Sequence, residues 1–222
     1  MTGSTRLVHS ATPATGTDTG GATRRSFDAD RDALHSAFPR VVAEFGWAQT
    51  STARVAHDAA IPAHEFWNHY RSLEHLFVEV YDRMMERVTR TAIRAVASST
   101  LTLGREAWED QLDAIMTGVL AFFSLEPALS KTCLVEVLDA GPAARARRDD
   151  ALARFTGYVE GLRLSHGEPM PALAAEMIVL GTVDLIYSRV ARDEAETLLD
   201  LLPELRQLWR ASVEDASAST TA

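Results

Sequence analysis

Cysteine and lysine are nearly absent from this chain of 222 residues. Cys133 is the only cysteine, which excludes an intrachain disulfide and a four-cysteine zinc site. We expect Cys133 to be a small buried side chain rather than a reactive thiol. Lys131 is the only lysine, so nearly all of the basic groups are arginines.

The sequence also lacks a recognisable export signal and a long apolar run. Residues 1–26 have no apolar core of the kind that secretory signals carry. The most apolar run, residues 177–190, contains Asp184 and Arg189 and is too short and too charged to span a bilayer. We therefore expect a cytoplasmic protein that does not interact with membranes.

Acidic residues exceed basic ones, and the formal net charge is −9. This charge excludes a protein that binds nucleic acid with its whole surface, because phosphates would be repelled from most of it. A small nucleic-acid-binding head on an acidic body remains compatible with the composition.

Helical patterns fill the chain from about residue 30, and no segment alternates as a strand does. Residues 1–28 and 216–222 are rich in small polar residues and predict disordered tails. Residues 29–75 predict a head with three helices, and residues 76–215 predict a helical bundle. The expected fold is all-α, with about nine helices. Predicted body helices cover residues 105–124, 126–139, 143–165, 170–191 and 202–214.

The head contains the signals of a helix-turn-helix. Its first helix ends at Gly46, a typical C-terminal stop. A second helix begins at the hydroxyl caps of residues 50–52. The Ile61-Pro62 turn leads to a third helix that ends near His69, and Ser72 caps a long fourth helix through about residue 98. Two short helices joined so tightly form a unit whose second helix is sized for a DNA major groove.

The order of these features resembles the TetR (tetracycline-repressor-like) family of bacterial regulators over about residues 32–81. The resemblance implies DNA binding by the head, a ligand pocket in the body and dimerisation through the last two helices. The residues that carry it are Glu44 to Gly46, Thr50-Ser51, Val55-Ala56, Ala59-Ala60-Ile61, Phe66-Trp67, His69-Tyr70, Ser72-Leu73-Glu74 and Leu76.

Several side chains of the helix-turn-helix suit contacts with a duplex. Hydroxyls and helix N-termini attract phosphate, although the hydroxyls at residues 50–52 suit capping alone equally well. Arg54 suits a phosphate, Asn68 can pair with adenine, and Glu65 can accept from cytosine. The candidate DNA-binding residues are Thr50, Ser51, Thr52, Arg54, Ala63, His64, Glu65, Trp67, Asn68, His69, Tyr70 and Arg71.

Three positions depart from the family pattern. Leu73 stands where the family usually has a lysine, and Glu65 puts a carboxylate on the reading face. Ala60 replaces the usual turn glycine. Acidic residues also outnumber arginines between residues 30 and 90. We therefore expect DNA binding to be weak or sensitive to salt.

Large apolar side chains recur at helical spacing in the body. Most of them suit ordinary core packing, and some suit a mostly apolar ligand pocket with a few polar groups. For Asp184, a pocket, a dimer interface and an exposed face are equally compatible with the pattern. The predicted pocket residues are Trp108, Met116, Phe122, Phe123, Glu136, Phe155, Tyr158, Met177, Leu180, Asp184 and Tyr187.

The predicted helix over residues 170–191 is apolar around most of its circumference, so part of it needs a cover from another chain. Together with residues 198–209 it predicts a two-fold, four-helix homodimer interface. The candidate interface residues are Val183, Ile186, Val190, Leu202, Leu205, Leu208 and Trp209.

Residues arranged for catalysis are not found. The sequence has no glycine-rich phosphate loop and no nucleophile elbow, so we predict neither an enzyme nor a cofactor. The segment HEFWNH, from His64 to His69, superficially matches a zinc-protease motif. Its histidines are five residues apart, which puts them about 140° apart on a helix, and we predict no metal site.

Two functions follow from these features. The favoured one is a ligand-responsive transcriptional regulator that binds double-stranded operator DNA, a repressor released by a small, largely apolar effector. The alternative is a helical small-molecule binding or partner protein with a degenerate helix-turn-helix that no longer binds DNA.

Overall fold

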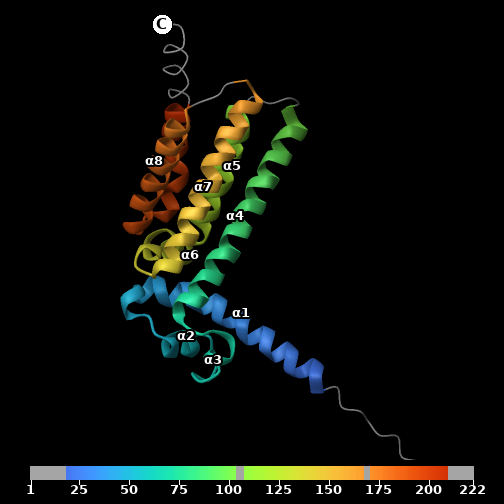
Figure 1. Cartoon of the computed structure of the whole chain (residues 1–222), viewed down its shortest axis with the longest axis vertical. Helices are drawn as coiled ribbons and strands as arrows, with labels where there is room; N and C mark the ends of the chain where they lie inside the picture. Colours follow the sequence, from blue (N-terminus) through green and yellow to red (C-terminus); the bar gives the residue numbers. More distant parts are fainter. Residues whose placement is uncertain (1–18, 104–107, 168–170, 210–222) are drawn as a thin grey trace, which may run out of the picture.

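The fold is a small helical head joined to a larger helical body by one long helix (Figure 1). The structure, a computed structural model, describes residues 19–103, 108–167 and 171–209. Every regular element within these ranges is helical, and they contain no strand. The predicted all-α class, with a helix-turn-helix head and a helical bundle, is confirmed.

The head consists of three helices and one short 3₁₀ turn. The first helix begins earlier than predicted, so residues 19–28 of the predicted tail are helical. Residues 1–18 and the predicted tail at 216–222 lie outside the described residues. The elements are α1 (Thr19–Phe45), η1 (Trp47–Gln49), α2 (Thr52–Asp58) and α3 (Phe66–His69).

The helix boundaries of the head follow from local chemistry. Gly46 has a φ of 75°, in the left-handed region that favours glycine, and α1 ends immediately before it. Ser51 Oγ accepts a hydrogen bond from Arg54 N–H at 3.2 Å and caps α2. Ser72 Oγ accepts one from His75 N–H at 3.0 Å at the start of the fourth helix. These three boundary signals operate as predicted.

The body is a bundle packed along α4 (Leu73–Leu103), which continues past the break predicted near residue 98. α5 runs beside α4, and α7 packs against both α4 and α8 (Figure 1). The elements are α5 (Trp108–Leu125), α6 (Pro127–Ser130), the π-helical turn η2 (Lys131–Val135), η3 (Glu136–Leu138), α7 (Pro142–Ser165), α8 (Ala172–Ala191), η4 (Ala195–Leu201) and a helix over residues 202–209.

One apolar core extends from the head into the body. The rings of Phe38 in α1 and Phe77 in α4 meet edge to face with centroids 6.0 Å apart, and Trp47 meets Phe77 at 5.8 Å. Such pairs add about 0.5–1.5 kcal/mol beyond the burial of their area. Cys133 is buried in the same core, as predicted, and burial raises the pKa of its thiol. The head is therefore held to the body by packing.

Among the described residues, no single helix is both long and apolar enough to cross a bilayer. One pair of consecutive helical segments, Trp108–Leu125 and Pro127–Leu138, meets the requirement by length and composition but is bent by 104°.

Candidate nucleic-acid interface and ligand pocket

A tight turn joins α2 to α3 and is closed by backbone hydrogen bonds. Ala60 N–H donates to the carbonyl of His57 at 3.0 Å, and Ile61 N–H donates to the carbonyl of Ala56 at 3.0 Å. Ala60 has a φ of 57°, in the left-handed region. An alanine in this region costs roughly 1–2 kcal/mol, so a glycine would fit the turn with less strain.

The second helix of the helix-turn-helix, α3, is a single turn, shorter than predicted. The chain before it winds more tightly, with Glu65 N–H donating to the carbonyl of Pro62 at 2.9 Å. Phe66 is fully buried, as predicted for a residue that packs the helix onto the head. Its neighbour Trp67 is 58% exposed. α3 is thus anchored through Phe66 and presents Trp67 outward.

Most of the predicted DNA-binding residues lie at the surface, but Thr50 and Tyr70 do not. Thr50 is buried and its hydroxyl donates to the carbonyl of Gly46 at 2.8 Å. Tyr70 is 1% exposed within the core. Because neither side chain reaches the outer face, both are removed from the predicted contact set. The exposed members are Ser51, Arg54, Ala63, His64, Trp67, Asn68 and Arg71, and the half-buried ones are Thr52, Glu65 and His69.

Arg54 is held in place by an aromatic ring. Its guanidinium lies over the ring of Phe45, 4.3 Å from the centroid. At an exposed site such a contact contributes about 0.5–1 kcal/mol. Stacking uses the face of the guanidinium, whereas a phosphate is bound at its edge. The stack therefore orients Arg54 and leaves it compatible with a phosphate contact.

Glu65 engages its neighbours on the reading face. Asn68 Nδ2 donates to Glu65 Oε2 at 2.5 Å, and His64 Nε2 lies 3.4 Å from Oε1 of the same carboxylate. The amide of Asn68 is therefore turned toward Glu65. Pairing with adenine requires Asn68 to exchange this bond for one to the base.

The histidines of the HEFWNH segment have separate surroundings. His64 is exposed beside Glu65, whereas the ring of His69 stacks obliquely on Phe27 with centroids 4.2 Å apart. Within the described ranges, no three histidine, cysteine or carboxylate side chains are arranged to hold a metal ion.

A polar cluster joins α1, the end of α3 and α4. Glu79 on α4 binds Arg31 through one carboxylate oxygen, which also lies 3.0 Å from His35 Nε2. Tyr70 Oη lies 2.7 Å from the same nitrogen and accepts a hydrogen bond from Arg31 Nε at 3.3 Å. We call His35, Tyr70, Glu79 and Arg31 the Glu79 cluster.

Burial sets the protonation states in the Glu79 cluster. It raises the pKa of Tyr70 to about 12, so the side chain is a neutral phenol. Burial, aided by the charge of Arg83, lowers the pKa of His35 despite the opposing carboxylate. Burial acts to raise the pKa of Glu79, but the hydrogen bond from Arg31 and the nearby positive charges outweigh it and lower that pKa. At neutral pH the cluster therefore contains a neutral imidazole and an ionised carboxylate.

Two carboxylates bind backbone N–H groups of distant segments: Glu136 joins the body to the head, and Glu74 joins α4 to α7 within the body. Glu136 Oε2 accepts from Trp47 N–H at 2.7 Å, and Glu74 Oε1 accepts from Ala143 N–H in the first turn of α7 at 2.8 Å. Glu136, predicted as a polar group of the ligand pocket, instead binds the head through one carboxylate oxygen and does not line the cavity beside α5. Its carboxylate is occupied in joining the body to the head.

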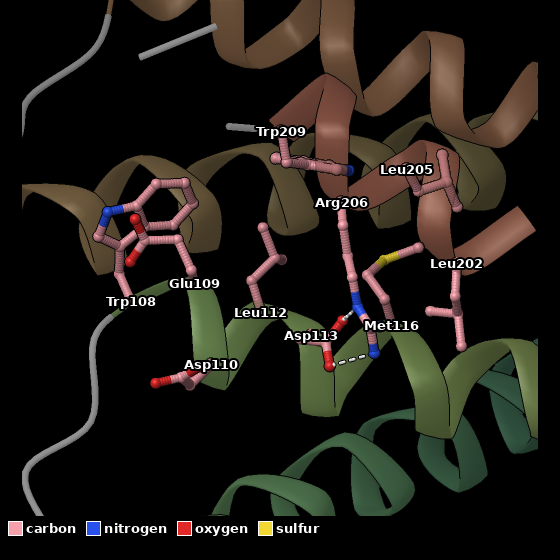
Figure 2. A pocket seen from close by; sticks show the side chains of 10 residues that line it. All are labelled: Trp108, Glu109, Asp110, Leu112, Asp113, Met116, Leu202, Leu205, Arg206 and Trp209. Carbon is pink, nitrogen blue, oxygen red and sulfur yellow. Dashed lines mark hydrogen bonds and ion pairs between the residues drawn. The ribbon is translucent and has the colours of Figure 1, made fainter. Parts of the chain in front are cut away.

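A cavity of about 380 Å³ lies between α5 and the helix over residues 202–209. Figure 2 shows the side chains of α5 facing those of the C-terminal helix, with the Arg206–Asp113 ion pair crossing the gap. Arg206 Nη2 lies 2.7 Å from Asp113 Oδ2, and this pairing raises the pKa of the arginine. The other lining residues are Trp108, Glu109, Asp110, Leu112, Met116, Leu202, Leu205 and Trp209.

Of the predicted pocket residues, only Trp108 and Met116 line this cavity. Phe123 is buried in the core, and Phe122 is half-buried beneath the guanidinium of Arg87. Phe155 and Tyr187 are half-buried elsewhere. The remaining predicted members, Tyr158, Met177, Leu180 and Asp184, are exposed in the single chain. Of the three locations considered for Asp184, its exposure is compatible with a dimer interface or a free surface.

Some of the residues predicted to form the homodimer interface are buried within the single chain, and others are accessible. Ile186, Val190, Leu205 and Trp209 are buried within one chain, so they offer a partner no surface, and their assignment to an interface is corrected. Val183 and Leu202 are half-buried, and Leu208 is exposed. These buried side chains point into the chain's own core because η4 and the following helix fold back onto α5 and α8.

A different apolar surface is exposed on α7 and α8. Leu173 and Met177 are 67% and 65% exposed, and with Leu180 and Asp184 they recur every three or four residues along one side of α8. A side chain added at either exposed glycine of α7 would meet nothing within 4 Å. We call this surface the α7–α8 face: Gly157, Gly161, Leu164, Leu173, Met177, Leu180 and Asp184.

Several residues that shape these sites had no signal in the sequence. Arg206 and Asp113 pair across 93 positions, and His35 and Glu79 across 44. Only the position of Glu79 next to the helical stripe Leu76, Phe77, Val80 and Tyr81 hints that this carboxylate needs a partner.

Solved structures of bacterial transcription regulators have the same arrangement of helices. The fatty acid degradation regulator FadR of Bacillus halodurans is 18% identical, with a TM-score of 0.66 over 81% of this chain and 93% of that chain. The FadR of Bacillus subtilis in complex with stearoyl-CoA is 16% identical, with a TM-score of 0.65 over 82% and 97%. A TetR family transcription regulator from Marinobacter aquaeolei is 18% identical, with a TM-score of 0.60 over 82% and 97%.

No protein-family model and no curated protein matches the chain. Although the identities are below one in five, the TM-scores of 0.60 to 0.66 establish a shared architecture, which covers 93% to 97% of these regulators. The chain therefore has the fold of the TetR-family transcription regulators.

Proposed function

We propose that the chain is a homodimeric, effector-responsive transcription regulator that binds operator DNA in the cytoplasm. The observation that carries this proposal is that one side of the α2–turn–α3 unit is buried in the core and the other side exposes basic and amide side chains. Phe66 and Tyr70 fix its inner side in the core, while Arg54, Asn68 and Arg71 lie on its outer side. A rigid unit with basic and amide groups outward suits the phosphates and base edges of a major groove.

Pairing of two chains is supported by the α7–α8 face. Each helix-turn-helix reads one half-site, and a two-fold dimer sets its two heads about 34 Å apart to reach successive major grooves. The apolar side chains Leu173 and Met177 are exposed in the single chain, and the glycines of α7 allow a partner helix to approach closely. Two α7–α8 pairs form a closed four-helix interface under two-fold symmetry.

The cavity beside α5 supports a small, largely apolar effector. Its volume lies within the range of small-molecule sites, and Leu112, Met116 and Leu205 contribute apolar walls. The carboxylates of Glu109, Asp110 and Asp113 line the cavity, and the guanidinium of Arg206 is the one basic group among the described lining residues. This charge disfavours an anionic ligand such as the stearoyl-CoA of the Bacillus subtilis structure. An uncharged or cationic apolar molecule fits the lining better.

The effector acts through α5 and α4. α5 packs against α4, and only three residues separate the end of α3 from the start of α4. A ligand that displaces α5 shifts α4 and changes the spacing of the two heads. In this mechanism the effector-free dimer binds DNA and represses transcription by occupying the operator, and the effector releases it.

The test is a fluorescence anisotropy titration of a labelled duplex from the region upstream of the chain's own coding sequence, beside a scrambled duplex. At low salt, about 50 mM, we expect saturable binding with a preference for the upstream duplex. Release by an effector is then screened with uncharged, cationic and acyl-CoA compounds. Quenching of tryptophan fluorescence reports binding directly, because Trp108 and Trp209 line the cavity. If no duplex binds at low salt, the proposed DNA binding is wrong.

A helical small-molecule binding protein without DNA affinity is the second candidate. The carboxylate of Glu65 favours it, because it occupies the amide of Asn68 and repels phosphates. This candidate predicts that fluorescence quenching by an effector persists while the anisotropy of every duplex stays flat.

A further inference from the structure

The shortness of α3 makes its orientation depend on outside contacts. One helical turn has too few internal hydrogen bonds to define its own direction. Phe66 fixes its beginning by packing, and Tyr70 follows directly after its last residue in an extended conformation. The rings of Phe66 and Tyr70 touch with centroids 5.7 Å apart. The hydroxyl of Tyr70 contacts Arg31 and His35 of α1, and through these two side chains this end of α3 is linked to Glu79 of α4.

We propose that Tyr70, His35 and Glu79 are positioning residues for DNA reading, which lock the end of α3 to α4 so that movement of α4 reorients the reading helix. The inference rests on the proposed function and names the route by which the body acts on the head. None of the three side chains touches DNA.

Glu79 is the element of this lock that moves with the body. It lies six residues into α4, about 9 Å along the helix from Leu73. One of its oxygens binds Arg31, lies 3.0 Å from His35 and lies 3.7 Å from Arg83. Hydrogen bonds weaken steeply when the atoms separate by more than a few tenths of an ångström. A shift of α4 by 1–2 Å, on the scale of helix shifts in switching proteins, is therefore enough to release the cluster.

The neutral form of His35 suits the locked arrangement. A carboxylate only accepts, so the 3.0 Å contact with Glu79 places the imidazole proton on Nε2, between Glu79 and Tyr70. The charged groups that face this ring are Arg31 from α1 and Glu79 and Arg83 from α4, while Asp32 is paired with Arg83 at 3.0 Å. A second proton would place another positive charge beside two arginines in a buried site. Acid therefore loosens the lock.

The experiment compares Tyr70→Phe, Glu79→Gln and their double variant in the full chain, using the anisotropy titration. Tyr70→Phe is expected to weaken DNA binding by about five-fold, the effect of removing one neutral hydrogen bond, and Glu79→Gln by about ten-fold or more, because the bond from Arg31 to its carboxylate is charge-assisted. The double variant should weaken binding by less than the product of the two, because the groups act as one unit. Asp193→Asn, which breaks the Lys131–Asp193 pair in the body and removes one negative charge as Glu79→Gln does, is the matched control and should change affinity by less than about two-fold.

Two readouts separate positioning from general stability. Hydrogen exchange without DNA should show faster exchange at the amides of Trp67 to Tyr70 in both variants, with the amides of α7 unchanged. In the wild type, protonation of His35 should lower DNA affinity as the pH falls from about 7.5 to about 5.5. In His35→Gln this pH-dependent loss of affinity should be smaller. Wild-type exchange rates at α3 in Tyr70→Phe and Glu79→Gln would overturn the inference, as would additive losses of affinity.

The proposed function can fail separately. If the wild-type chain binds no duplex at low salt, the proposed DNA binding is wrong. The exchange measurement then decides alone whether the Glu79 cluster orients α3.

Discussion

Glu136 accepts a hydrogen bond at 2.7 Å from the backbone N–H of Trp47, a residue 89 positions earlier in the chain. The donor lies at the start of the turn η1, where N–H groups have no partner within the helical turn. The acceptor lies on η3 in the body. A charged acceptor on a helix N-terminus is favourable, so this bond fixes the head against the body.

Removal of the Glu136 carboxylate should destabilise the chain. Glu136→Ala leaves the half-buried N–H of Trp47 without its acceptor, which costs about 1–3 kcal/mol in the free energy of unfolding. Glu136→Gln keeps an acceptor oxygen and should cost roughly 1 kcal/mol or less. Urea unfolding measures both. Glu86→Ala, at an exposed position of α4, should stay within about 0.5 kcal/mol of the wild type. Equal values for all variants would show that the bond contributes no stability.

The strained turn between α2 and α3 should respond to glycine in opposite ways at adjacent positions. Ala60→Gly removes the strain of a left-handed alanine, which stabilises the folded state by roughly 1–2 kcal/mol. The same change gives the unfolded chain more conformational entropy, which destabilises the fold by about 0.4–1 kcal/mol. A net gain of about 0.5–1 kcal/mol is expected. Ala59→Gly, in a right-handed helical conformation, should instead cost about 0.5–1 kcal/mol. Thermal unfolding distinguishes them, and a shared sign would contradict the geometry of the turn.

The carboxylate on the reading face should weaken DNA binding. Glu65→Gln removes a negative charge near the phosphates and keeps an oxygen that accepts from Asn68. We expect affinity to rise by about five-fold at low salt, equivalent to roughly 1 kcal/mol, with the gain shrinking as salt increases. Titrations at several salt concentrations measure this. A fall in affinity would mean instead that Glu65 accepts a hydrogen bond from a base.

The α7–α8 face should be the surface that pairs two chains. Met177→Lys introduces a charge at the centre of this apolar stripe and should convert the dimer to a monomer, because burying an unpaired charge is costly. Light scattering after size-exclusion chromatography gives the mass. Leu125→Lys, at a more exposed leucine at the end of α5, should leave the dimer intact. A Met177→Lys protein that stays dimeric would place the interface elsewhere.

The sequence was sufficient for three helix boundaries in the head, because local groups define them, but not for the start of α1 or of α3. Gly46, Ser51 and Ser72 act within one turn of their own position. The Ala60 turn also depends only on its neighbours. These features need no knowledge of the rest of the chain.

The sites were less predictable, because they depend on which side of a helix meets the core. α8 is apolar around most of its circumference, so its pattern does not distinguish the buried Ile186 and Val190 from the exposed Leu173 and Met177. Two predicted interface residues of this helix, Ile186 and Val190, are therefore buried within the chain, whereas two predicted pocket residues, Met177 and Leu180, are exposed. Contacts such as Glu136 with Trp47 join distant segments, and only the packed chain brings their atoms together.

The most direct test of the central claim is the salt dependence of DNA binding by the wild type and by Arg54→Ala. If α2 and α3 read a duplex, the wild type binds at low salt and the logarithm of its affinity falls linearly with the logarithm of salt concentration. Arg54→Ala should lower affinity for all sequences and make the slope shallower by about 0.9 for each phosphate that a chain no longer neutralises. Arg90→Ala, exposed on α4 away from α2 and α3, should match the wild type. A wild-type slope indistinguishable from that of Arg54→Ala, or no binding by either, would contradict DNA recognition by this head.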